Sequence, residues 1–100
     1  MEIREFQKLI KKLYFHKDSE RGVEKTFIWL CEELGELAEA LLKKDKAMLK
    51  EELADVFAWL VSLANLLEID LEDAVEKSTQ NFVLSAERLR ASVKKRRNKL

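Results

Sequence analysis

The chain has 100 residues, of which 47% are hydrophobic and 38% charged, with two glycines and no proline. A chain of this length forms one domain with a modest core, so we expect a single domain over residues 1–100 that assembles with itself. The scarcity of Gly and Pro, beside abundant Ala, Leu, Glu and Lys, favours an all-α fold. No signal peptide or membrane-spanning run is recognisable, so we expect a cytoplasmic protein without membrane contact.

Charge is unevenly distributed, although the formal net charge is zero. Residues 1–87 hold 12 basic and 19 acidic side chains, whereas residues 88–100 hold seven basic ones and no acidic one. A basic chain end can bind nucleic acid. Cations also suit the C-terminal end of a helix and keep a frayed end hydrated, and we favour that interpretation for a basic tail over about residues 94–100. Nucleic acid is therefore not an expected partner.

Hydrophobic periodicity predicts four helices, and the polar segment over residues 17–22 is expected to be a loop after the first one. Asp45 and Asp70 are N-cap candidates for the third and fourth helices. A short break before Asp45 makes the second and third helices an antiparallel hairpin. We expect a four-helix bundle-like protomer with this hairpin at its centre. The expected ranges are about Glu2–His16, Val23–Leu42, Ala47–Leu67 and Leu71–Arg97.

One acidic pattern occurs twice, as Leu-Cys-Glu-Glu-Leu-Gly-Glu-Leu from Leu30 and as Leu-Lys-Glu-Glu-Leu-Ala-Asp-Val from Leu49. On a helix, each copy places two carboxylates three residues apart at one edge of its apolar face. Both pairs lie about 14 Å from the intervening turn, so they face each other at one level of the hairpin. Clustered carboxylates repel unless a hard cation binds between them, and Mg²⁺ is the natural ion, with Mn²⁺ possible. The expected metal ligands are Glu33, Glu36, Glu52 and Asp55.

Two other classes of function remain open from the residues alone. An acidic helix face is usually just solvated, which would make the chain a non-catalytic helical interaction or oligomerisation module. A redox bundle with two iron or manganese ions also uses inward carboxylates, but it adds Glu-x-x-His pairs, and neither acidic copy contains histidine. The matched register and height of the two pairs favour a metal site over solvated faces.

The same residues resemble the E-E-x-x-E…E-x-x-D signature of the MazG-type nucleotide pyrophosphohydrolases. Here Glu32-Glu33-x-x-Glu36 is followed, after the fifteen-residue spacer 37–51, by Glu52-x-x-Asp55. The resemblance covers about residues 17–81. It implies Mg²⁺-dependent cleavage of a nucleoside triphosphate between the α and β phosphates, which releases nucleoside monophosphate and pyrophosphate. Glu32 is then the candidate catalytic residue, for water activation or a second metal.

Four other residues are candidate substrate contacts. Lys77 and Asn81 match a Lys-x-x-x-Asn element of the family that resembles a phosphate and sugar contact, although the Arg that often follows is Leu84 here. Lys17 and Arg21 are similar to a basic loop that precedes the first motif in some small MazG-like proteins. These two side chains either clamp phosphates or are ordinary charges of a surface loop.

Aromatic and apolar residues outside the acidic pattern suggest further contacts. Trp29 and Trp59 lie four residues from an acid of each copy and at matching heights, so they either stack on a nucleobase or cover the core or a subunit interface. The fourth helix outruns the hairpin by about 10 Å. Its Phe82, Leu89 and Val93 are expected to be covered by a second copy of the chain, in a homodimer or homotetramer.

Overall fold

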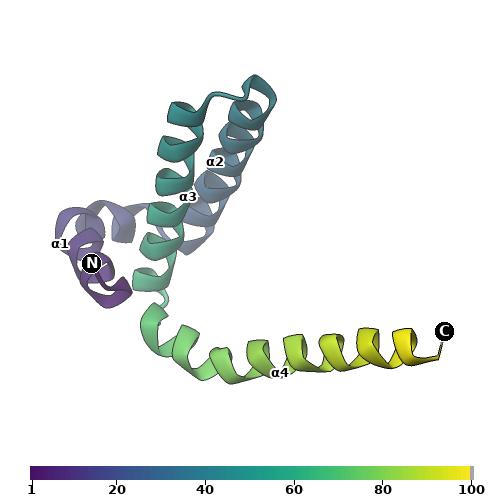
Figure 1. The fold of residues 1–100 in the computed structure, drawn as a ribbon. Helices are drawn as coiled ribbons and strands as arrows, with labels where there is room; N and C mark the ends of the chain where they lie inside the picture. Colours follow the sequence, from purple (N-terminus) through teal and green to yellow (C-terminus); the bar gives the residue numbers. More distant parts are fainter. Residues whose placement is uncertain (100) are drawn as a thin grey trace.

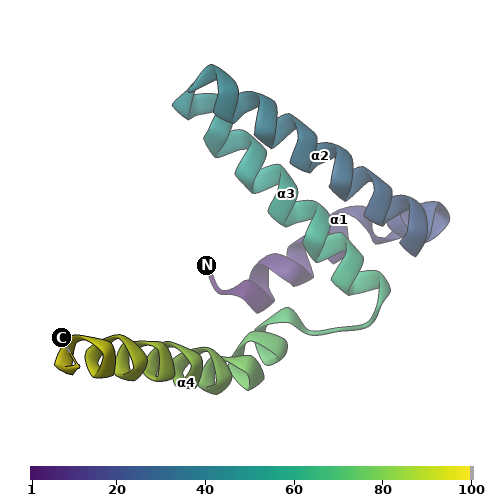
Figure 2. The same cartoon turned by 90° about the vertical axis from the view of Figure 1, so that its right-hand side faces the viewer.

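The computed structural model describes residues 1–99, which form four helices and no strand in that range. The helices are α1 (Ile3–Arg21), α2 (Val23–Lys43), α3 (Lys46–Leu66) and α4 (Leu71–Asn98). Helices α2 and α3 form an antiparallel hairpin, α1 packs against the C-terminal half of α3, and α4 projects away (Figures 1 and 2). The predicted all-α fold and central hairpin are confirmed. Leu100, the last residue of the predicted domain and basic tail, lies outside the described residues.

A short turn closes the hairpin as the sequence predicts. Lys44 ends α2 in the left-handed conformation, with φ of 54°. The Asp45 carboxylate then accepts hydrogen bonds from the backbone N–H groups of Ala47 at 3.0 Å and Met48 at 3.2 Å. This is the N-cap arrangement, which satisfies donors that have no partner inside the helix. The turn fixes the register in which the two acidic copies meet.

Helix α1 is longer than predicted, because the expected loop over residues 17–22 is helical up to Arg21. The Arg21 guanidinium donates to the Asp18 carboxylate, three residues earlier, at 2.8 Å, and Asp18 is almost fully buried. Pairing at this spacing supports helix, and it offsets the polar composition from which a loop was inferred. The actual break is Gly22 alone, whose φ of 86° favours glycine.

A polar network joins α1 to the turn between α3 and α4. Buried Gln7 donates to the Asn65 side chain at 3.1 Å and to the Ile69 carbonyl at 2.7 Å, and it accepts from the Leu71 N–H at 2.9 Å. The Asn65 side chain donates to the backbone carbonyl of Gln7 at 3.3 Å. Because every member of such a buried network has a partner, the network holds a defined geometry. It therefore sets the direction in which α4 leaves the molecule.

The core of the single chain is smaller than the sequence pattern predicts. Its buried apolar residues include Ile10, Leu30 and Val61. On α2 the less exposed positions follow the line of Thr26, Leu30, Glu33 and Leu37, so the packed side of the helix is displaced toward the carboxylates. Several apolar residues of α2 and α3 are therefore exposed in the single chain, and we call them the hairpin apolar face: Phe27, Leu34, Leu41, Leu53 and Leu60.

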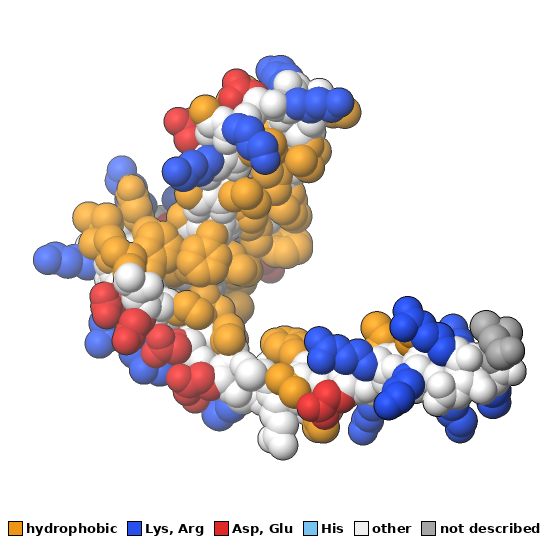
Figure 3. Space-filling model, in the orientation of Figure 1, with side chains coloured by type: hydrophobic (Ala, Val, Ile, Leu, Met, Phe, Trp, Pro, Cys, Tyr) orange, Lys and Arg blue, Asp and Glu red, His pale blue; other side chains and the backbone are white. Residues whose placement is uncertain are grey.

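Helix α4 stands apart from the hairpin along most of its length. Within residues 1–99 its main packing partner is α1, near the start of α4, and its remainder extends into solvent with basic side chains around it (Figures 1 and 3). Phe82, Leu89 and Val93 are all exposed, with Phe82 at 65%. No helix of residues 1–99 is long and apolar enough to span a membrane.

Candidate metal centre and adjacent pocket

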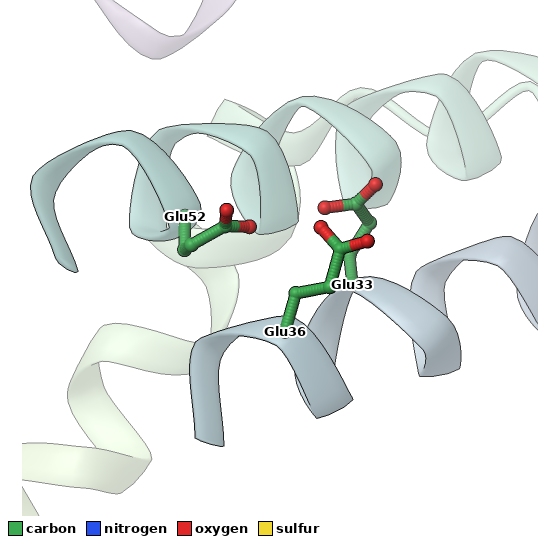
Figure 4. A group of neighbouring side chains, drawn as sticks. All are labelled: Glu33, Glu36 and Glu52. Atoms are coloured by element: carbon green, nitrogen blue, oxygen red, sulfur yellow. The ribbon is translucent and has the colours of Figure 1, made fainter. Parts of the chain in front are cut away.

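Three carboxylates meet between the helices of the hairpin. Glu33 and Glu36 come from adjacent turns of α2, and Glu52 comes from α3 (Figure 4). One carboxylate oxygen from each residue lies within 4.8 Å of the other two. The i,i+3 spacing puts the two α2 acids on one edge, and the antiparallel register brings Glu52 to the same height. The structure thus assembles three of the four predicted ligands into one cluster.

The environment of these oxygens fits a divalent cation. Oε2 of Glu33 and Oε2 of Glu52 are buried and have no hydrogen-bond partner among residues 1–99. Within the same range, no Lys, Arg or His forms an ion pair with any of the three glutamates. Buried polar atoms are normally paired, and hard cations take several carboxylate oxygens. The donor set is therefore the one that Mg²⁺ or Mn²⁺ prefers.

Burial and mutual repulsion raise the pKa values of two acids in the cluster. Partial burial and the negative charges of Glu36, Asp55 and Glu52 raise the pKa of Glu33 to about 6. Partial burial and the charges of Glu36 and Asp55 also raise the pKa of Glu52. Both shifts have the direction expected when desolvation and like charges disfavour ionisation. The metal-free cluster therefore destabilises the folded chain at neutral pH.

This shift predicts a pH dependence of stability in EDTA. Glu33 has a folded-state pKa of about 6, above its ordinary value of 4.5. A raised carboxyl pKa gives stability that is fully present below pH 4.5 and is lost as pH rises through about 6. Thermal melts of wild type and Glu33→Gln between pH 4 and 7.5 should therefore show the wild type losing stability relative to the variant as pH rises. A constant difference between the two proteins across that range would contradict the shift.

Two other predicted acids lie outside the three-residue cluster. Asp55 is exposed on α3, one turn after Glu52, yet its charge contributes to the raised pKa of both Glu33 and Glu52, so it lies close to the centre. Glu32 is exposed on α2, next to Glu33 in sequence. Consecutive helical residues point about 100° apart. Glu32 therefore points further away from the cluster than Asp55 does. The roles of both residues stay predictions.

A pocket adjoins the carboxylates between α1 and α3. Its volume is about 370 Å³, and Asp55 forms part of its wall. Lys17 and Arg21, predicted from sequence as a phosphate clamp, both line it, although they lie on the last turns of α1 rather than on a loop. The other lining residues are Ile10, Tyr14, Asp18, Ala58, Trp59 and Ser62.

Sequence reasoning named Lys17 and Arg21 on the α1 side of this pocket but missed Tyr14 and Asp18, because it placed residues 17–22 in a loop. The Asp18-x-x-Arg21 spacing was the available signal, since oppositely charged residues three apart support a helix and share one face. Tyr14 lies one turn earlier on the same helix. No feature of the sequence by itself indicates that α1 packs beside Asp55.

The two tryptophans stack on each other across the hairpin. The ring centroids of Trp29 and Trp59 are 6.1 Å apart with an interplanar angle of 18°. The Arg21 guanidinium lies 4.7 Å from the Trp59 ring centroid, a cation–π distance. The predicted matching heights are therefore confirmed. Trp29 and Arg21 of the same chain both contact Trp59, which favours a role for Trp59 in the pocket wall.

Lys77 and Asn81 are exposed on α4, and Lys77 pairs with Asp73 one turn earlier at 3.1 Å. Within residues 1–99, α4 packs mainly on α1, so a single chain does not bring this pair onto the α2 carboxylates through helix packing. Their contact with substrate stays a prediction.

Comparison with known proteins agrees with the site. The family model described as the MazG nucleotide pyrophosphohydrolase domain matches residues 21–83, which include all five acids of the two motifs. No curated protein matches the chain. The matched segment covers α2, α3 and the first half of α4, well over half of the chain. The chain therefore belongs to the MazG nucleotide pyrophosphohydrolase family.

Proposed function

We propose that this protein is a divalent-metal-dependent nucleoside triphosphate pyrophosphohydrolase, with Mg²⁺ as its ion, that releases nucleoside monophosphate and pyrophosphate. Family membership supports nucleotide pyrophosphohydrolase activity in general. The observation that carries the metal dependence is the cluster of Glu33, Glu36 and Glu52 with its two buried, unpartnered oxygens. A solvated acidic face would leave such oxygens accessible to water.

Each acidic residue has a proposed task. Glu33, Glu36 and Glu52 hold the cation, with Asp55 as the fourth ligand at the pocket edge. When bound, the cation supplies charge neutralisation for the triphosphate. Glu32, the residue before Glu33 in the sequence, is proposed to accept a proton from the attacking water. The proposed bond broken is the one between the α and β phosphates.

Cationic residues are proposed to bind the remaining phosphate charge. Lys17 is exposed at the pocket rim, and Arg21 keeps N–H donors beyond the one that Asp18 occupies. Lys77 and Asn81 are proposed to come from the partner subunit, because α4 of the same chain leaves the hairpin. The proposed assembly is a homodimer, or a homotetramer built from it, in which α4 of one subunit covers the hairpin apolar face of the other.

The reaction products test the proposed bond cleavage. Attack at the α phosphate gives monophosphate and pyrophosphate, whereas attack at the γ phosphate gives diphosphate and orthophosphate. We expect anion-exchange chromatography of an ATP reaction with Mg²⁺ to show AMP and pyrophosphate as the primary products. ADP as the primary product would contradict the proposal. No hydrolysis of any nucleoside triphosphate would favour the non-catalytic interaction module instead.

A further inference from the structure

Asp18 is a buried carboxylate that does not belong to the carboxylate cluster of the metal centre. Only 2% of the residue is exposed, and its two oxygens have different environments. Oδ1 accepts a hydrogen bond from Nη1 of Arg21 at 2.8 Å. Oδ2 is buried and has no hydrogen-bond partner among residues 1–99. Because leaving a buried acceptor unpaired costs free energy, Oδ2 indicates a donor that comes from a bound molecule.

The surroundings of Asp18 favour a nucleoside over a phosphate group. Asp18 lines the pocket of about 370 Å³, a volume within the range of about 300–1,000 Å³ that small-molecule sites occupy. The charges of Lys17 and Arg21 in the pocket wall balance those of Asp18 and Asp55. The aromatic rings of Tyr14 and Trp59 supply flat apolar surface. An unpaired carboxylate oxygen repels a phosphate, whereas it binds an N–H group of a heterocycle.

The position of the pocket agrees with this assignment. Asp55 belongs both to its wall and to the charge cluster of the metal centre. A nucleotide with its phosphates on the carboxylates therefore has this pocket next to them for its base. Both Lys17 and Asp18 line the pocket, Lys17 as an exposed cation and Asp18 as a buried carboxylate.

On the basis of the proposed function, we propose that this pocket binds the nucleobase and that Oδ2 of Asp18 accepts a hydrogen bond from an exocyclic amine of that base. Cytosine and adenine carry such an amine, whereas uracil and hypoxanthine present a carbonyl oxygen at the same position. A carboxylate accepts hydrogen bonds and donates none when ionised. The site therefore prefers cytosine over uracil and adenine over hypoxanthine, because the carbonyl oxygen of uracil or hypoxanthine would face a carboxylate oxygen that also only accepts.

The wild-type protein gives the first test. With Mg²⁺ fixed, kcat/KM is measured for CTP against UTP and for ATP against ITP. We expect each amine-bearing nucleotide to be preferred by about tenfold or more. A ribose hydroxyl is the other donor that Oδ2 can contact, so CTP is also compared with its 2′- and 3′-deoxy forms. Equal rates for CTP and UTP, with a loss on removing either hydroxyl, would overturn the amine assignment.

Asp18→Asn gives the sharper test. Arg21 has only donors, so it holds the amide oxygen in the place of Oδ1 and directs the amide NH₂ into the place of Oδ2. The variant therefore offers a donor where the wild type offers an acceptor. We expect the CTP/UTP preference to reverse, while cleavage still gives monophosphate and pyrophosphate. An unchanged ratio in a variant that melts like the wild type would overturn the proposal.

Glu20→Gln is the matched control, since it makes the same carboxylate-to-amide change on α1. Glu20 is exposed, pairs with His16 at 3.1 Å and does not line the pocket. We expect its CTP/UTP ratio to equal that of the wild type. If Asp18→Asn fails to fold, the wild-type comparison still decides. Hydrolysis without base preference overturns this inference alone, whereas absence of all hydrolysis overturns the proposed function with it.

Discussion

Glu33→Gln is expected to abolish Mg²⁺-dependent hydrolysis, with kcat/KM falling by about 100-fold or more. Glu33 contributes one of the three clustered oxygens, and its other oxygen is buried without a partner. The amide keeps the shape of the side chain but removes the negative charge that a hard cation requires. Steady-state release of pyrophosphate from a nucleoside triphosphate measures the loss.

Thermal stability separates loss of the metal from loss of the fold. Mg²⁺ should raise the melting temperature of the wild type by mass action, and this gain should disappear in Glu33→Gln. In EDTA near pH 7 the variant should melt at or above the wild-type temperature, because one repulsive charge is gone. A wild-type melting temperature that stays constant from micromolar to tens of millimolar Mg²⁺ would count heavily against the site.

Glu39→Gln is the matched control on the same helix. Glu39 is exposed and pairs with Lys43 at 3.3 Å, outside the carboxylate cluster. Exposed i,i+4 pairs contribute a few tenths of a kcal/mol, so this change should barely alter stability. The control should keep both the Mg²⁺ response and full hydrolysis. Equal losses in the two variants would point to a general effect of charge on α2.

Phe82→Glu is expected to lower the oligomeric state and to reduce turnover, although Phe82 lies outside the acidic motifs. Phe82 is 65% exposed in one chain, on a helix that stands apart from the hairpin. Burial of a Phe side chain contributes about 1.5–3 kcal/mol. Because a twofold interface loses this contribution twice, association should weaken by about two orders of magnitude or more.

Activity should fall with assembly, because Lys77 and Asn81 would no longer reach the carboxylates of the partner. Light scattering across a range of protein concentrations gives the mass, and hydrolysis is measured on the same samples. Ala91→Glu is the control, since it adds the same charge on the opposite side of α4, about 180° from Phe82. A wild-type protein that is monomeric at micromolar concentration with full activity would refute the proposed role of assembly.

The sequence by itself determined the helices of the hairpin and the acids that meet in it. Periods of three and four residues define α2 and α3, and Asp45 caps α3 as predicted. Because the midpoint of Glu33 and Glu36 and the midpoint of Glu52 and Asp55 lie at similar distances from one short turn, helical geometry alone places the two pairs at one height. Local spacing was sufficient here, since a tight antiparallel hairpin leaves little freedom of register.

Tertiary structure decided which apolar residues are buried and where the other helices lie. Sequence period marks an apolar face without giving the number of helices that cover it, and Phe27 and Leu34, which lie on the apolar face of α2, are exposed in one chain. The direction of α4 depends on the buried network around Gln7, which joins residues 58 and more positions apart. Asp18 became a candidate binding residue for the same reason: its burial beside Asp55 depends on the packing of α1 against α3, and local sequence does not encode that contact.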